Sequence, residues 1–380
     1  MARGPDGAGQ TQGFSLKDQL FNADTIGDLA AEYAVLPGFD PDRFVSEALA
    51  GLSSRGLLER LDWLADCIET QLPDQFPDMA DALEAAMPEA LDPGKSDDDF
   101  GRFIHAVPGI LAVRHGLQDH RDRALDLIEA ATQRFSMEFY IRPFLNRWPD
   151  ETLARLTRWT EHENYHVRRL VSEGTRPRLP WAANIQLDPL VPLRLLDALH
   201  ADPTRYVTRS VANHMNDLTR HAPDRVVDTL QRWQQAGQQD PRELDWMMRH
   251  ALRTAVKRGE AGALALLGYA QDRPVSVTLH LEPNPVRIGD ALQIEVTLQA
   301  DEALPVMVDY RIRFHRPNGR SGEKVFKLAT ANVKPGIPLT LRKVHKLKGS
   351  ASTFTLHPGP HLVTIQVNGQ DKAEAAVVLL

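Results

Sequence analysis

Apolar residues recur at intervals of three and four along residues 14–270, the spacing that places them on one face of a helix. The interval is clear at Phe44, Ala48 and Leu49, and in the run from Leu57 to Ile68. Prolines punctuate the region at Pro37, Pro73, Pro77, Pro93, Pro143, Pro149, Pro180, Pro203, Pro223 and Pro241. Because proline is tolerated near the start of a helix but not in its interior, these residues mark element boundaries. The pattern predicts many short helices, as a helical solenoid requires.

A short motif repeats within this helical region. Three segments of eight residues align on Arg169, Arg209 and Arg253, with spacings of 40 and 44 residues. Two-helix HEAT-type repeats have a period of about 40–47 residues. The alignment therefore predicts one inner helix per repeat, each with an arginine at the same level. A helical bundle without true repeats is the alternative.

The hydrophobic period changes to two near residue 271. Alternation is clear in Val275–Leu281, Leu292–Leu298, Val306–Phe314 and Leu362–Val367. Turn residues separate these runs at Pro317-Asn318-Gly319, Pro335-Gly336, Pro358-Gly359 and Asn368-Gly369. About seven strands in about 110 residues is the size of an immunoglobulin-like sandwich. We therefore predict a mostly α protein: a flexible tail at residues 1–13, a HEAT-like helical-repeat solenoid at 14–271, and a C-terminal immunoglobulin-like β-sandwich at 272–380.

Composition narrows the class of protein. The 380 residues are 42% hydrophobic and 25% charged, which is ordinary for a globular chain. The single cysteine, Cys67, excludes an internal disulfide and a cysteine-based zinc site, and fits a reducing, cytoplasmic location. The sequence contains no run of about 18 consecutive apolar residues, so it predicts no membrane-spanning helix. The first 13 residues lack the apolar core of a secretory signal.

Charge is distributed unevenly along the chain, whose net charge is -7. Residues 1–141 hold 11 basic and 26 acidic residues, whereas residues 142–258 hold 19 and 14, and residues 259–380 hold 14 and 11. All but one of the 19 basic residues in the middle segment are arginines, which suit bidentate contact with phosphate. Local charge decides whether a nucleic acid can dock, so the acidic total does not exclude one. Solvated helix faces with ion pairs are the other interpretation.

Signatures of common catalytic classes are missing. The sequence has no GxGxxG, Walker, GxSxG or HExxH motif. His162 and His166 are four residues apart, which could place two metal ligands on one helix face, but no third ligand follows at a suitable spacing. We therefore expect no metal and no cofactor.

Acidic and basic residues alternate in the segment from Ser136 to Asp217. Placed on inner helices, three groups would each lie on one helix face, one turn apart: Glu138 with Arg142, Arg169 with Glu173, and Arg209 with Asn213 and Asp217. Two interpretations are open. The groups form structural ion pairs, or they form a cationic groove with a few carboxylates at its centre. Because carboxylates repel DNA, a DNA-binding groove would hold them only for a purpose.

The segments RPFL and HENYHVRRLVSEGTRPRLPW, which lie between residues 142 and 181, and RSVANHMNDL at 209–218 resemble the bacterial DNA alkylation repair glycosylases of the AlkC and AlkD families. The predicted immunoglobulin-like domain favours AlkC. The resemblance implies a monomeric, monofunctional enzyme that acts on double-stranded DNA, away from membranes. It would cut the N-glycosidic bond of cationic bases such as 3-methyladenine and 3-methylcytosine, without flipping the base into a deep pocket.

The resemblance also implies the site. Catalytic roles fall to Glu138, as principal carboxylate, and to Glu173 and Asp217, whereas Trp181 forms an aromatic wall and Arg169 anchors a phosphate. The residues expected to bind DNA are Arg142, Arg168, Arg209, Lys346 and Lys348. A cationic base leaves without strong acid catalysis, so the enzyme needs negative charge beside the developing oxocarbenium sugar and a positioned water. Carboxylates supply both.

The C-terminal part has its own basic set, Arg342, Lys343, Lys346 and Lys348, which precedes Gly349-Ser350. This set either contacts DNA or forms a solvated strand edge whose lysines prevent aggregation. The resemblance favours DNA contact. The alternative function for the whole chain is a HEAT-type scaffold that binds DNA or protein without catalysis.

Overall fold

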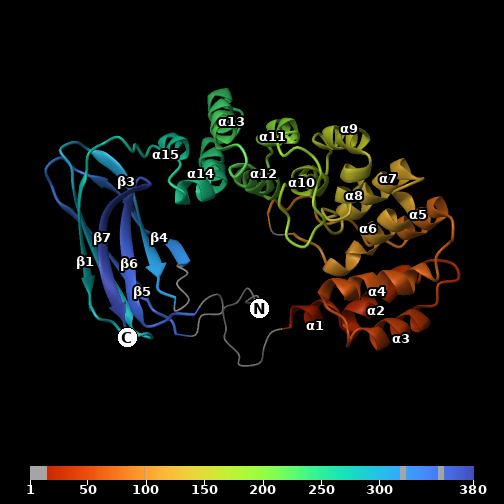
Figure 1. Cartoon of the computed structure of the whole chain (residues 1–380). Coiled ribbons are helices and arrows are strands. Elements are labelled where there is room, and N and C mark those ends of the chain that lie inside the picture. The colour runs from red at the N-terminus through yellow and green to blue at the C-terminus, as the bar shows by residue number, and fades with distance from the viewer. Residues whose placement is uncertain (1–14, 98, 317–321, 350–354) are drawn as a thin grey trace. The chain divides into compact units, whose positions relative to one another are not determined.

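The computed structural model describes residues 15–97, 99–316, 322–349 and 355–380. The predicted tail at 1–13, the predicted turn at Pro317-Asn318-Gly319, and Ser350 lie outside these residues. Helices come first along the described chain and strands follow (Figure 1). The predicted fold class, helices followed by an antiparallel β-sandwich, is therefore confirmed.

Most helices are short, as the proline spacing predicts. They are α1 (Leu16–Leu20), α2 (Ala23–Tyr33), α3 (Pro41–Gly51), α4 (Leu57–Glu69), α5 (Phe76–Ala85), a 3-10 turn (Phe103–Ala106), α6 (Val107–Leu111), a π-helical turn (Ala112–Gly116), α7 (Arg121–Thr132), α8 (Ile141–Arg147), α9 (Pro149–Trp159), α10 (Tyr165–Gly174), α11 (Leu193–Leu199), α12 (Arg205–Leu218), α13 (Pro223–Ala236), α14 (Pro241–Lys257) and α15 (Ala261–Leu266). None of the helices in the described residues is long and apolar enough to cross a membrane.

Local sequence signals explain where these helices begin and end. Pro149 and Pro223 are the first residues of α9 and α13, where a missing N–H costs no hydrogen bond. The α13 helix ends at Gly237, whose φ of 61° is the left-handed conformation that glycine adopts without strain. Arg169, Arg209 and Arg253 fall on α10, α12 and α14, which is every second helix in chain order. This alternation is what the repeat alignment predicts.

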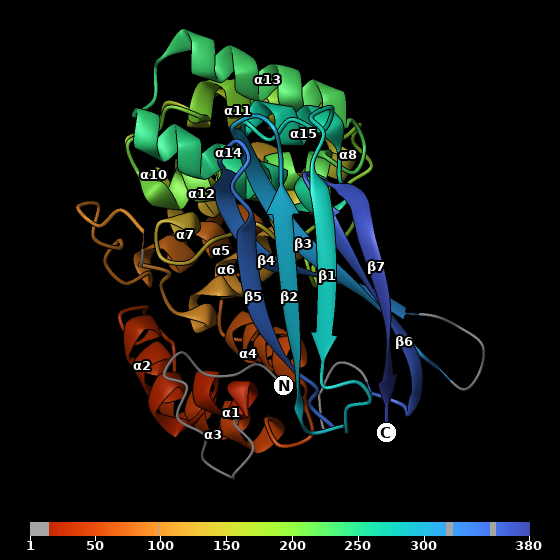
Figure 2. The ribbon, with the colours of Figure 1, turned by 90° about the vertical axis from the view of Figure 1, so that its left-hand side faces the viewer.

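In the part of the chain that the structure describes, seven antiparallel strands follow the helices. They are β1 (Ser276–Glu282), β2 (Ala291–Gln299), β3 (Leu304–Phe314), β4 (Gly322–Val333), β5 (Leu339–Lys346), β6 (Gly359–Val367) and β7 (Gln370–Leu379). One sheet has the strand order β1-β2-β5, and the other has the order β4-β3-β6-β7. The strands of both sheets are labelled in Figure 2. The predicted turn at Asn368-Gly369 joins β6 to β7, and both of its residues have positive φ. That conformation is the one a tight hairpin turn requires.

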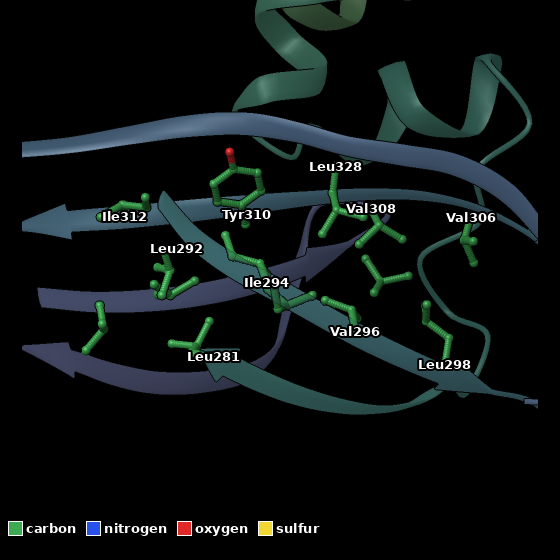
Figure 3. Close-up of a cluster of buried hydrophobic side chains, with 14 of the residues drawn as sticks. Leu281, Leu292, Ile294, Val296, Leu298, Val306, Val308, Tyr310, Ile312 and Leu328 are labelled. Atoms are coloured by element: carbon green, nitrogen blue, oxygen red, sulfur yellow. The ribbon is translucent and has the colours of Figure 1, made fainter. Parts of the chain in front are cut away.

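The sandwich core lies between the two sheets. Ile294 and Val296 from β2 face Val308 and Tyr310 from β3, and all four are buried (Figure 3). Strand β2 alternates buried apolar with more exposed polar residues along its length, which is the period-two pattern of the sequence. The β-sandwich is thus stabilised by burial of one face of each sheet.

The chain divides into two compact units, Met1–Asp217 with Gln238–Pro241, and Leu218–Gly237 with Arg242–Leu380. Within the second unit, Gln271 Nε2 donates to the carbonyls of Gly259 (2.9 Å) and Asn368 (2.8 Å). Asn368 Nδ2 donates to the Ala270 carbonyl (2.7 Å). These bonds connect the end of the helical segment to the β6–β7 turn. The domain boundary at residue 271, between the last helix and the first strand, stays a prediction.

Candidate active site

The candidate site is built on α10 and α12, on the turn before α8, and on the segment that follows α10. Val167, Leu170 and Val171 of α10 are fully buried, which fixes the rotation of this helix. Gly174 ends α10 against α8, where a Cβ atom would lie 2.5 Å from Ile141 Cγ2. This close approach brings the charged side chains of α10 next to the turn before α8.

Five charged side chains form an alternating chain, Glu138–Arg169–Glu173–Arg176–Asp217. Arg169 Nη1 donates to Glu138 Oε2 (2.9 Å), and Arg169 Nη2 lies 3.5 Å from Glu173 Oε2. Arg176 Nη1 donates to Glu173 Oε1 (2.6 Å). Arg176 Nε donates to Asp217 Oδ2 (2.9 Å). The three carboxylates predicted to be catalytic therefore lie in one ion-pair network, in which the guanidinium groups of Arg169 and Arg176 connect them.

Glu138 is more accessible than the other two carboxylates, Glu173 and Asp217, which are both buried. Glu173 is 5% exposed, and its two oxygens accept from Arg176 on one side and from Ser210 Oγ (2.7 Å) on the other. Glu138 is more exposed, with 17% of its side chain accessible. Of the two carboxylate oxygens of Glu138, only Oε2 accepts a hydrogen bond from the described residues. Oε1 therefore has no partner among these residues. Glu138 is thus the carboxylate with an oxygen available to a ligand.

Electrostatics keep the centre of this chain ionised. Burial alone would raise the pKa of Glu173, but the guanidinium groups of Arg169 and Arg176 and the Ser210 hydroxyl outweigh it and lower the pKa. Burial lowers the pKa of the neighbouring His214 to about 3, so this imidazole is neutral at physiological pH. His214 Nδ1 donates to the Ser172 carbonyl (3.0 Å). The site therefore holds fixed negative charge next to a neutral imidazole.

The structure corrects the predicted helix face that pairs Glu138 with Arg142. Glu138 lies in the turn before α8, in which Tyr140 N donates to the Met137 carbonyl (3.0 Å). Arg142 lies in α8, is 1% exposed, and donates to the carbonyls of Gly174, Arg176 and Ala183. Because its guanidinium is buried against backbone, Arg142 does not offer it to a phosphate. Arg142 instead holds the segment that follows α10.

Trp181 lies in that segment, between α10 and α11. Its side chain is 72% exposed, and its φ of 67° is rare for a residue other than glycine. Arg142 binds this segment on both sides of Trp181, at Arg176 and at Ala183. An exposed indole held on an anchored loop suits contact with a large flat ligand.

The other predicted DNA contacts differ in accessibility. Arg168 is paired with Asp202 through Nε (2.6 Å) and Nη2 (3.2 Å), with 14% of its side chain exposed, so it is largely committed to this ion pair. Arg209 is half-buried and lies 2.9 Å from the Asp97 carboxylate. Both expected arginine contacts are thus neutralised by a carboxylate in this structure.

Sequence reasoning assigned no role to Arg176, which is a member of the charged chain, or to three neighbours of the chain. Arg176 joins two of the carboxylates, and Ser210 donates to Glu173. Ser136 Oγ accepts from Arg169 Nη1 (2.6 Å), and the Tyr206 ring lies under the Arg169 guanidinium, 4.9 Å from its carbon. Arg176 could have been found from its i,i+3 spacing to Glu173; the other three depend on tertiary contacts between elements.

The predicted histidine pair does not form one helix face. His162 precedes α10 and its Nδ1 accepts from Asn164 N (3.0 Å), whereas His166 is buried in α10. No group of three or more His, Cys, Asp or Glu side chains that could hold a metal ion occurs among the described residues. Cys67 is buried in α4, and burial raises its thiol pKa to about 11, which makes it unreactive.

The basic set of the C-terminal part lies along β5 and just beyond it. Lys343, Lys346 and Lys348 are exposed. Arg342 is paired with Glu295 of β2 (2.6 Å). Since β5 is an edge strand of its sheet, both predicted roles, DNA contact and protection of the edge, are compatible with this position.

The fold and the site define a class, helical proteins with a C-terminal immunoglobulin-like module. A family model described as "Uncharacterised protein YhaZ, C-terminal Ig-like domain" matches residues 276–380. The Uncharacterized protein YhaZ of Bacillus subtilis (strain 168) is 30% identical over 362 residues, which cover 93% of this chain and 96% of the relative. The structure of Pseudomonas fluorescens alkylpurine DNA glycosylase AlkC, bound to DNA containing an abasic site analog, is similar with a TM-score of 0.83 and 30% identity, over 95% of this chain and 99% of that one. The chain belongs to the AlkC family.

Proposed function

We propose that the protein is a monofunctional DNA glycosylase that removes cationic N-alkylated bases, such as 3-methyladenine and 3-methylcytosine, from double-stranded DNA as a monomer. The similarity to an alkylpurine DNA glycosylase bound to DNA over nearly the whole of both chains supports this class of activity. The observation that carries the proposal is the chain of three carboxylates joined by two arginines, in which Glu138 keeps one oxygen available.

The chemistry follows from the charge of the lesion. In 3-methyladenine the base is cationic, so the electron pair of the C1′–N9 bond leaves with the base and neutralises it. The sugar becomes an oxocarbenium ion, which a nearby carboxylate stabilises by its negative charge. Water then adds to C1′ and loses a proton to a carboxylate, as in glycoside hydrolysis. In our proposal Glu138 faces the sugar and this water, and Glu173 and Asp217 add fixed negative charge behind it.

Trp181 and Arg169 complete the proposed site. The exposed Trp181 indole stacks against the cationic base, where aromatic faces are attractive to positive charge. Arg169 is 13% exposed and paired with two carboxylates, so its main role is to orient Glu138, and phosphate contact requires it to shift. No deep pocket for a flipped base is needed when the lesion is contacted from the duplex surface.

The test is release of free base from methylated duplex DNA by the full-length protein, with EDTA present. We expect 3-methyladenine in the supernatant and intact abasic strands, because hydrolysis at C1′ leaves the phosphodiester backbone uncut. Binding without release of any base would overturn the proposal and favour a non-catalytic scaffold. Loss of release with EDTA would contradict a metal-free mechanism.

The substitution Asp97→Asn should raise the affinity for DNA two- to fivefold. Asp97 neutralises Arg209, and the Ser96 carbonyl next to it accepts from Tyr206 N (2.8 Å) at the start of α12. A phosphate must displace this carboxylate, and half-exposed ion pairs are worth about 0.2–1 kcal/mol. Affinity is measured by fluorescence anisotropy at several salt concentrations. Asp81→Asn on α5, which removes the same charge beside Arg123, is the control. Equal effects of the two substitutions would show that net charge alone is responsible.

Reversal of charge at Lys346 and Lys348 tests the C-terminal part as a DNA contact. We expect the double substitution to glutamate to weaken DNA binding and to flatten the log–log salt dependence by about one unit per lost phosphate contact. Reversal of Lys334 and Lys372, which lie in the β4–β5 turn and in β7, changes the charge equally and serves as the control. An unchanged slope in the Lys346/Lys348 variant would assign these lysines to protection of the strand edge.

A further inference from the structure

We propose that Arg176 is a positioning residue of this site, which holds Glu173 and Asp217 together as a fixed pair of carboxylates. The inference rests on the proposed glycosylase function and extends it to a residue that touches neither base nor sugar. Arg176 would act on the reaction only through the two acids it binds.

The geometry of the guanidinium group supports this role. Arg176 uses two different nitrogens for two different acids: Nη1 donates to Glu173 Oε1 (2.6 Å) and Nε donates to Asp217 Oδ2 (2.9 Å). The side chain is only 14% exposed, so these bonds are little weakened by water. A planar fork of this kind sets the angle between its partners as well as their distance.

The backbone of Arg176 is itself fixed. Arg176 N donates to the Glu173 carbonyl (3.3 Å) in the turn that ends α10, and the Arg176 carbonyl accepts from the buried Arg142 Nη1 (2.9 Å). The guanidinium therefore starts from an anchored point and reaches from the end of α10 to α12.

Arg176 also favours the ionised form of the carboxylates that it binds. Burial favours the protonated form of Glu173, and Arg176 is one of the groups that oppose this effect, so its loss should raise the pKa of this carboxyl. The charged and titratable groups that face Glu173 are Arg169, Arg176, Arg142, Tyr206 and His214. His214 is neutral and Arg169 is shared with Glu138, whereas Arg176 contacts both Glu173 and Asp217.

The experiment compares single-turnover base release by the wild type, Arg176→Met and Arg176→Lys over the range pH 5–8. Removal of the cation raises the pKa of the acids it binds, so their protonation begins at higher pH. We expect the acid limb of the Arg176→Met profile to move up by about one to three pH units. The rate at neutral pH should fall about tenfold or more, because the acids lose their alignment. Arg176→Lys keeps the charge but not the fork, so it should restore the acid limb and only part of the rate.

The control is Arg123→Met. Arg123 also bridges two carboxylates, with Nη1 on Glu84 (2.6 Å) and Nη2 on Asp81 (2.7 Å), but on α7 and α5. Its loss should leave the acid limb in place. If Arg176→Met does not fold, Arg176→Lys provides the test: an acid limb like that of the wild type together with a lower rate would support the positioning role. A wild type that releases base, with an acid limb unmoved in Arg176→Met, would overturn the role of Arg176. A wild type that releases no base would overturn the proposed function.

Discussion

Glu138→Gln should lower the rate of base release about a hundredfold while DNA affinity changes less than threefold. Glutamine has the shape of glutamate and can still accept from Arg169, so the site should keep its geometry. What it lacks is the negative charge beside the oxocarbenium sugar and a base for the attacking water. Loss of one such electrostatic partner costs on the order of 3 kcal/mol of transition-state stabilisation, or about a hundredfold in rate.

The measurement is single-turnover release of 3-methyladenine, with affinity for the same DNA measured separately. Glu84→Gln is the matched control, because Glu84 is likewise paired with an arginine but lies on α5. A Glu138→Gln rate within threefold of the parent would contradict the assignment. Glu173 would then be the next carboxylate to test.

The helices and strands could be predicted from the sequence because the spacing of apolar residues that defines them lies within each segment. A stripe of apolar residues three and four apart defines a helix wherever it packs, and prolines such as Pro149 and Pro223 lie at the predicted helix starts. Strict alternation in β2 and β3 likewise reflects one buried face. The long-range pairing of the strands, with β5 beside β2, has no equivalent local signal.

The site was predictable where its residues share one helix. Arg169 and Glu173 are one turn apart on α10 and form an ion pair there, as their spacing predicts. Glu138 and Arg142 have the same spacing, yet a turn ends between them and the prediction of a shared face is wrong. Spacing of four carries information only inside a continuous helix, and the short α8 begins too late to include Glu138.

Burial of charge is the second feature that the sequence could not reveal. Arg142 and Arg209 look alike in the sequence, because both are predicted to lie on inner helices. In the structure Arg142 is enclosed by backbone carbonyls, whereas Arg209 is half-buried beside a carboxylate 112 positions earlier in the chain. Whether an arginine meets backbone, carboxylate or solvent depends on elements far away in the sequence.

Arg142→Met should destabilise the protein by about 2–4 kcal/mol. Burial lowers the pKa of Arg142 to about 10, so the guanidinium is charged at neutral pH although it is enclosed. Its stabilising partners are the carbonyls of Gly174, Arg176 and Ala183. Methionine fills similar volume but leaves these carbonyls without donors, and each buried orphan costs about 1–3 kcal/mol, reduced where water can reach it.

Chemical denaturation of the full chain measures this loss, and hydrogen exchange shows where it acts. We expect the amides between Thr175 and Asn184 to exchange faster, because Arg142 joins both ends of this segment to α8. Arg147→Met on the same helix removes an exposed arginine and should change stability by about 0.5 kcal/mol or less. If Arg142→Met were as stable as the parent and instead flattened the salt dependence of DNA binding by about one unit, Arg142 would be a phosphate contact after all. That result would require α8 and the segment after α10 to separate when DNA binds, since the buried guanidinium cannot reach a phosphate otherwise.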